Sequence, residues 1–249
     1  MSEVEFKYFI YSDLAPRPES PASIGAKFVK TLDALTCIEP TIFVNWEVMD
    51  LPAIASHPLA AARSRIAALI EHNVSRGDFR EPDPDSGYSA VAFTDNVIES
   101  RRISLRIHTG GIYKGDTWLE TADWKALPDP AIVTYEIFKK ALLTINEIWP
   151  PPWACASAFR MDYDSVPLAP GAQLFPSSRF HIPWVGYLSA SLITRMVLPP
   201  PEIVTERTPD GGLLMIATED RLDPTNPEHL WRARIIAERM IAGTGNTSQ

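Results

Sequence analysis

Proline is the residue that most restricts how this chain can fold. There are 23 prolines among 249 residues, which is nearly twice the usual share of about 5%. Proline has no backbone N–H and clashes with the preceding helical turn, so it ends helices and is kept out of central strands. The prolines cluster at residues 16–21, 82–84, 128–130, 150–152 and 199–201. This spacing predicts many short elements and loops rather than a bundle of long helices.

Two periods of hydrophobic residues occur between these breaks. The helical period, with Ser20 and Asn226 placed as caps before a proline, predicts helices over residues 21–39, 58–73, 129–149, 189–197 and 227–242. Apolar and β-branched runs predict strands over residues 6–11, 41–47, 88–94, 103–109, 154–161, 184–188, 202–207 and 213–218. We therefore expect one α+β domain spanning residues 1–249, with a mostly antiparallel mixed sheet and four to five helices packed on one face of it.

The charge of the chain limits its partners. The formal net charge is −8 and the pI is about 5.2, and no basic run is longer than two residues. Proteins that bind nucleic acid usually carry a basic stripe that displaces counterions from the phosphates. The sequence thus argues against direct nucleic-acid binding and favours a basic protein or a neutral ligand as partner.

The compartment is inferred from the termini and the cysteines. No apolar run approaches the roughly 18 residues of a membrane span, and residues 1–13 lack the features of a signal peptide. Cys37 and Cys155 are too few and too far apart for a disulfide framework or a zinc site, so we expect two reduced thiols in the core. A cytoplasmic protein that does not bind membranes is predicted.

Residues 208–221 are the strongest candidate for chemistry. Asp210 follows a proline, and Glu219, Asp220 and Arg221 are consecutive. This arrangement approaches the carboxylate pattern of metal-dependent nucleases. Arginine is a poor substitute for the lysine of that pattern because its guanidinium does not deprotonate. Residues 209–212 also read as a hairpin turn. We therefore expect no metal, cofactor or catalytic residue. The alternative is a metal-dependent hydrolase that uses Asp210 and Glu219, or Asp162 and Asp164. A binding module for a small ligand is a third possibility.

A series of short motifs occurs in one order near the C-terminus. These are WVGYLSA at residues 184–190, the prolines at 199–201, EIVTER, PDGG, LLMIATED, and NPEHLWRAR at 226–234. The arrangement resembles the immunity protein 52 family of bacterial polymorphic toxin systems and is most specific over residues 184–240. The resemblance implies a protein that binds and neutralises a cognate toxin with a restriction-endonuclease-like fold, commonly delivered by contact-dependent or type VI secretion. It implies no catalysis by the chain itself.

The surface that binds such a toxin is predicted from charge. A nuclease toxin presents a basic DNA-binding cleft, to which acidic side chains are attracted. The expected contact residues are the acidic loop residues Asp78, Glu81, Asp83 and Asp85, together with Asp116, Trp118, Glu120 and Asp123. Aromatic side chains flanked by charges are typical of protein interfaces. The oligomeric state and the mode of inhibition are left open by the sequence.

Overall fold

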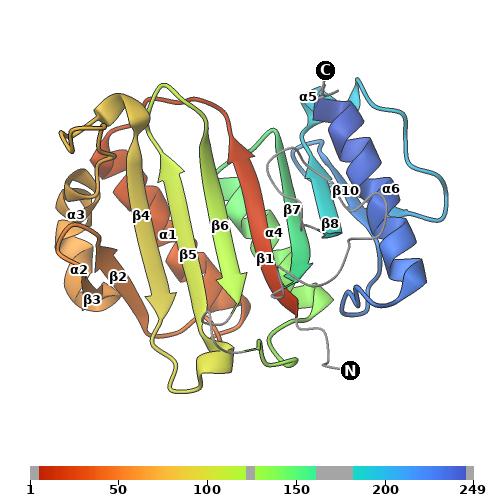
Figure 1. Cartoon of the computed structure of the whole chain (residues 1–249), viewed down its shortest axis with the longest axis horizontal. Coiled ribbons are helices and arrows are strands. Elements are labelled where there is room, and N and C mark those ends of the chain that lie inside the picture. Colours follow the sequence, from red (N-terminus) through yellow and green to blue (C-terminus); the bar gives the residue numbers. More distant parts are fainter. Residues whose placement is uncertain (1–5, 122–126, 161–181, 245–249) are drawn as a thin grey trace.

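The computed structural model describes residues 6–121, 127–160 and 182–244. Within them, ten strands form one sheet in the order β3-β2-β4-β5-β6-β1-β7-β8-β10-β9, and all neighbouring strands are antiparallel (Figure 1). The strands are β1 Phe6–Leu14, β2 Trp46–Asp50, β3 Ala55–Pro58, β4 Tyr88–Thr94, β5 Ile103–Thr109, β6 Gly115–Thr121, β7 Trp153–Arg160, β8 Ile182–Leu188, β9 Val204–Arg207 and β10 Leu213–Ile216. The predicted α+β class is confirmed.

The helices cover the sheet unequally. They are α1 Pro21–Ile38, α2 Leu59–Ala62, α3 Ile66–His72, α4 Tyr135–Ile148, α5 Ala190–Ile193 and α6 Pro227–Thr244, with 3-10 turns η1 Arg63–Arg65, η2 Pro84–Ser86 and η3 Glu99–Arg101. Figure 1 shows α1 and α4 behind the sheet and α6 in front of β8 and β10. Alternation is clear in β5, where the odd-numbered residues 103–109 are buried under the helices and Arg106 is exposed on the other face.

Strand β8 lies where helices cover both faces of the sheet. All seven of its residues are buried. A Cβ on Gly186 would lie 2.6 Å from Met240 Sδ in α6, whereas the next residue, Tyr187, lines a cavity with Leu143 of α4. Successive residues of a strand point to opposite faces. The expectation that all helices pack on one face is therefore wrong, because α6 covers the face opposite to α4.

A β-bulge in β8 supports the core between the two helix layers. Val185 pairs with Ala156 and Pro183 pairs with Ser157, so Trp184 is the extra residue between them. Its indole is fully buried, lies 5.4 Å from the ring of Phe138 in α4, and donates from Nε1 to the carbonyl of Thr218 at 2.9 Å. The large apolar ring and the satisfied N–H together make Trp184 a central packing residue.

Several element bounds differ from the sequence-based expectations. The strand expected at 41–47 begins only at Trp46, because Asn45 has a φ of 52° and the preceding residues form a turn. The helix expected at 58–73 is divided into α2, η1 and α3. Strands β3 and β6 had not been predicted. Cys155 is buried as expected, but Cys37 is exposed on α1, so the prediction of two core thiols is wrong for Cys37.

Candidate functional site

Several connections leave the sheet at the same end. In register, the strand-terminal residues Leu14, Gly115, Trp153, Leu188 and Leu213 are neighbours across five strands. We call this the Gly115 end of the sheet. The connections 15–20, 110–114 and 208–212 all begin or finish there, and loops of this kind on a rigid sheet are the usual location of binding residues.

Two of these connections, 15–20 and 110–114, are joined through glycines to each other and to the loop before β4. Glu19 N donates to Gly110 O at 3.3 Å, and Ile112 N donates to Asp85 O at 2.8 Å. Gly110 has a φ of +91°, and a Cβ on Gly111 would lie 2.3 Å from Asp85 O. A side chain at Gly111 would push the two backbones apart, and one at Gly110 would be strained by the positive φ and would clash with Ile24 Cδ1 at 2.6 Å. The β1–α1 connection, the loop before β4 and the β5–β6 turn therefore form one rigid junction.

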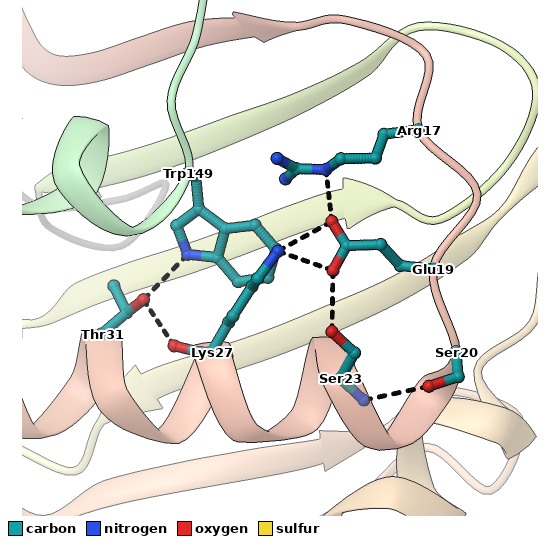
Figure 2. A network of polar contacts seen from close by, with 7 residues as sticks. All are labelled: Arg17, Glu19, Ser20, Ser23, Lys27, Thr31 and Trp149. Atoms are coloured by element: carbon teal, nitrogen blue, oxygen red, sulfur yellow. Dashed lines mark hydrogen bonds and ion pairs between the residues drawn. The ribbon is translucent and has the colours of Figure 1, made fainter.

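An ion cluster supports this junction from the helical side (Figure 2). The Glu19 carboxylate accepts from Lys27 Nζ at 2.8 and 2.7 Å and from Ser23 Oγ at 3.0 Å, and it pairs with Arg17. Burial would raise the Glu19 pKa, but the hydrogen bonds from Lys27 and Ser23 and the charge of Arg17 outweigh burial and hold the pKa below its usual value. Lys27 also lies 5.4 Å above the Trp149 ring. The cluster joins α1, the end of α4 and the β1–α1 connection.

The acidic loop predicted from the sequence is an ordered hairpin that projects from this junction. Arg76 forms a bridge with Pro82, and Gly77 N donates to Glu81 O at 3.0 Å. Arg80 N donates back to Gly77 O at 2.9 Å, with Arg80 at a φ of 66°. These bonds form a tight turn whose two central residues are Asp78 and Phe79. The loop thus has a defined conformation before any partner binds.

Exposed apolar side chains occur in this loop and in the β5–β6 turn that its Asp85 contacts. Phe79 is 92% exposed at the apex of the loop, and Ile112 and Tyr113 in the β5–β6 turn are 51% and 62% exposed. Asp78, Glu81 and Asp85 of the loop are exposed as well. We call these six residues the acidic tip. Exposed apolar side chains accompanied by charged ones are typical of a protein interface.

The fourth acidic residue of the loop has a different role. Asp83 caps η2, accepting from Ser86 N at 3.3 Å and from Ser86 Oγ at 2.5 Å. Its side chain is only half-exposed. Because its carboxylate holds the turn together, changing Asp83 would alter the shape of the loop as well as its charge. It is therefore not counted in the acidic tip.

Three other predicted contact residues lie in a row on the open face of β6. Asp116, Trp118 and Glu120 alternate with the buried residues of the strand. Trp118 stacks on Phe9 of β1 with ring centres 4.6 Å apart, and Asp116 pairs with Arg106 of β5 at 3.2 Å. Glu120 lies near Trp118 Nε1. This row begins at the Gly115 end and runs away from it, so only Asp116 lies close to the β5–β6 turn. Asp123 lies outside the described residues.

Of the nuclease-like pair, Asp210 is a turn residue, and Glu219 lies in a bend that follows β10. Asp210 lies in the β9–β10 turn, where it accepts from Thr208 Oγ1, from Tyr187 OH and from Gly212 N at 3.2 Å. Burial would raise its pKa, but these hydrogen bonds outweigh burial and lower it. Among the described residues, no group of three or more His, Cys, Asp or Glu side chains is placed to hold a metal ion. Asp162 and Asp164 lie outside the described part of the chain.

The sequence predicted the acidic loop as a contact surface, and this stays a prediction; it did not point to the exposed apolar residues of the acidic tip. Phe79 stands in the run RGDFRE, where an aromatic residue between charged neighbours in a loop was the available indication. Ile112 and Tyr113 similarly follow two glycines before Lys114. Nothing in the sequence shows that the loop before β4 meets the β5–β6 turn, because the bond from Ile112 N to Asp85 O depends on the pairing of β4 with β5. In the described residues, no helix has the length and apolar content needed to cross a membrane.

Comparisons with known proteins add a family relationship. A family model described as Immunity protein 52 matches residues 7–245. No curated protein matches the chain. Among solved structures, the Pseudomonas aeruginosa T6SS protein PA0821 aligns with a TM-score of 0.49 and 13% sequence identity, covering 95% of this chain and 76% of that one.

Proposed function

Since the chain belongs to the immunity protein 52 family, whose members are immunity proteins with a cognate toxin as partner, we propose that it neutralises a nuclease-type toxin by binding it in the cytoplasm. The toxin has a restriction-endonuclease-like fold and is delivered by a type VI or contact-dependent system. Binding alone accounts for the protection, and the chain carries out no chemistry on the toxin. This proposal extends the family relationship to one class of toxin.

Charge supports a nuclease as the partner. A nuclease cleft is basic because it binds phosphates, and a protein of net charge −8 is attracted to it over several ångströms. Attraction of this kind raises the association rate and orients the two proteins before contact. Fast association suits an immunity protein, which must bind the toxin before it reaches the DNA.

The acidic tip is the surface we assign to this interaction. The observation that carries the assignment is Phe79, a large apolar side chain that is 92% exposed on a turn with a defined conformation. Because the turn is already ordered, little conformational entropy is lost when a partner covers it. Burying a phenylalanine side chain contributes about 1.5–3 kcal/mol. Phe79 would thus enter an apolar recess of the toxin while Asp78, Glu81 and Asp85 meet its basic rim.

Two variants test the assignment. Phe79→Ala should weaken binding to a catalytically inactive toxin domain by about thirty-fold in Kd, which corresponds to about 2 kcal/mol. The double variant Asp78→Lys with Asp85→Lys should mainly slow association and reduce its dependence on salt. Isothermal titration and stopped-flow binding measure these effects, and survival of cells that express the active toxin measures protection.

A matched control is available in the β4–β5 connection. Val97 is 95% exposed and lies between Thr94 and Ile103, at the end of the sheet opposite to Gly115. Val97→Ala removes a similarly exposed apolar side chain without touching the acidic tip, so its affinity should equal that of the wild type. Equal affinities for Phe79→Ala and the wild type would remove the acidic tip from the interface. Toxin that is bound but is not a nuclease would refute the proposed toxin class.

A further inference from the structure

A cavity of about 260 Å³ lies between the C-terminal half of α4, β8 and the β9–β10 turn. Its lining residues are Leu143, Thr144, Asn146, Glu147, Tyr187, Thr208, Pro209 and Asp210. Pockets that hold small-molecule ligands and cofactors usually measure about 300–1,000 Å³. This cavity is slightly below that range and is open to solvent, so its size suits a single long side chain better than a cofactor.

The chemistry of the lining favours a cation. Glu147 and Asp210 supply two carboxylates, and the lining contains no lysine, arginine or histidine. Leu143, Pro209 and the ring of Tyr187 supply apolar walls. An arginine or lysine side chain combines an apolar stem with a charged head and fits this combination. An anion would be repelled by these two carboxylates.

The two carboxylates can bind such a cationic side chain for different reasons. Asp210 is held in one orientation by three donors, from Thr208, Tyr187 and Gly212, and a carboxylate has about four acceptor positions. About one acceptor position of Asp210 is therefore left for a bound cation. Glu147 is exposed and, among the described residues, its carboxylate has no hydrogen bond or ion pair. It also lies in the last turn of α4, where the helix dipole disfavours a negative charge.

We propose that this cavity receives one arginine or lysine side chain of the toxin, as a second contact beside the acidic tip. The inference rests on the proposed function and specifies its partner surface further. The position of Glu147 supports it, because an acidic side chain at the C-terminal end of a helix is unfavourable in the free protein. A bound cation offsets that repulsion.

The cavity and the acidic tip are close enough for one partner to cover both. The β9–β10 turn and the β5–β6 turn both lie at the Gly115 end, separated by the four strand steps from β6 to β10, and the loop that carries Phe79 leads into β4, six steps from β10. At about 4.8 Å per step these separations are about 19 and 29 Å. A typical interface buries about 800 Å² on each partner, which corresponds to a disc about 32 Å wide. A single toxin domain therefore spans the two contacts.

Two variants and one control test the cavity. Glu147→Lys replaces the unpaired carboxylate with a cation, and Thr144→Phe fills the cavity from the α4 side. Each should raise the Kd for the inactive toxin domain by about tenfold or more, because one charge-assisted hydrogen bond is lost. Glu147→Lys should leave the melting temperature unchanged or raise it, because lysine suits a helix C-terminus. A weaker complex with an equally stable protein is not explained by a structural role.

The control is Glu99→Lys, which makes the same change in net charge at an exposed site in the β4–β5 connection, away from the Gly115 end. It should bind the toxin within about twofold of the wild type. Toxin affinities of Glu147→Lys and Thr144→Phe that match this control would overturn the cavity proposal and leave the proposed function intact. A wild-type protein that does not bind the toxin would instead refute the proposed function.

A small-molecule probe tests the cavity without the toxin, and so separates the cavity proposal from the proposed function. N-acetyl-arginine amide, titrated into the ¹⁵N-labelled wild-type protein, should shift the amide signal of Gly212 in a saturable way and should fail to do so in Glu147→Lys. Gly212 reports on the cavity because its N–H donates to Asp210. The same titration with N-acetyl-leucine amide should give no shift. An arginine probe that leaves Gly212 unchanged in the wild type would refute a cation site.

Discussion

Replacing Glu19 with glutamine removes the centre of the ion cluster in Figure 2 while keeping its shape. The Glu19 side chain is 8% exposed, whereas those of Lys27 and Arg17 are 31% and 34% exposed. Breaking a fully buried ion pair costs about 3–5 kcal/mol. Because the two cations here are partly solvated, a smaller loss of about 2 kcal/mol in the free energy of unfolding is expected. For a chain of this size, that loss of about 2 kcal/mol corresponds to a fall of about 4–8 °C in melting temperature.

The pH dependence of the same variant provides a second test. The Glu19 pKa is lower in the folded state than in the unfolded state, where it is about 4.3. Its contribution to stability is therefore fully present above the unfolded-state pKa and is lost as pH falls through the folded-state pKa. Glutamine does not titrate, so the stability difference between wild type and Glu19→Gln should be largest at neutral pH and shrink in acid.

Urea unfolding followed by tryptophan fluorescence, repeated from pH 7 to pH 3, measures this difference. Asp33→Asn is the matched control, because Asp33 pairs with Arg63 while both side chains are about half-exposed, and exposed pairs contribute little. Stability equal to the wild type in Glu19→Gln at pH 7 would refute the reasoning. A difference that stays constant down to pH 3 would show that the ionised carboxylate is not its cause.

Two further predictions concern the core. Gly186→Val should destabilise the protein by about 1–3 kcal/mol in urea unfolding, because the new Cβ would lie 2.6 Å from Met240 Sδ and 2.8 Å from Ile236 Cγ2. A stability equal to that of the wild type would mean that α6 does not pack this closely. A thiol reagent at pH 8 should modify only Cys37 in the native protein and both cysteines in urea, because Cys155 is buried and desolvation raises its pKa to about 12. Rapid labelling of both thiols in the native protein would contradict the buried position of Cys155.

The sequence predicted the elements whose causes are local. Ser20 accepts from Ser23 N as the cap of α1, and Pro21 follows it at the first helical position, as the sequence indicated. The alternation of β5 and the hairpin turn at 209–212 were likewise readable. Strand β6 alternates as regularly as β5 but was missed, because its buried positions include Gly115, Thr117 and Thr121 rather than large apolar residues.

What the sequence could not provide depends on contacts between distant segments. The sequence does not show why residue 186 is a glycine, because the reason is the close contact with α6. No local pattern assigns α6 to the face opposite α4. The same holds for the candidate site. The acidic residues of the loop were predictable from composition, but the capping role of Asp83 depends on the bend at Ser86. The exposure of Phe79 depends on a turn stabilised by backbone bonds between Gly77 and its neighbours.

The packing of α6 on the second face of the sheet affects how the chain folds during synthesis. Strand β8 is made before α6, so its Gly186 face has no helix to cover it while the ribosome adds the intervening residues. Bacterial and eukaryotic ribosomes add about 5–20 residues each second, which leaves this apolar strand uncovered for a few seconds. Folding of the C-terminal half is therefore completed only after α6 emerges, and until then the uncovered strand is a site at which the nascent protein can aggregate.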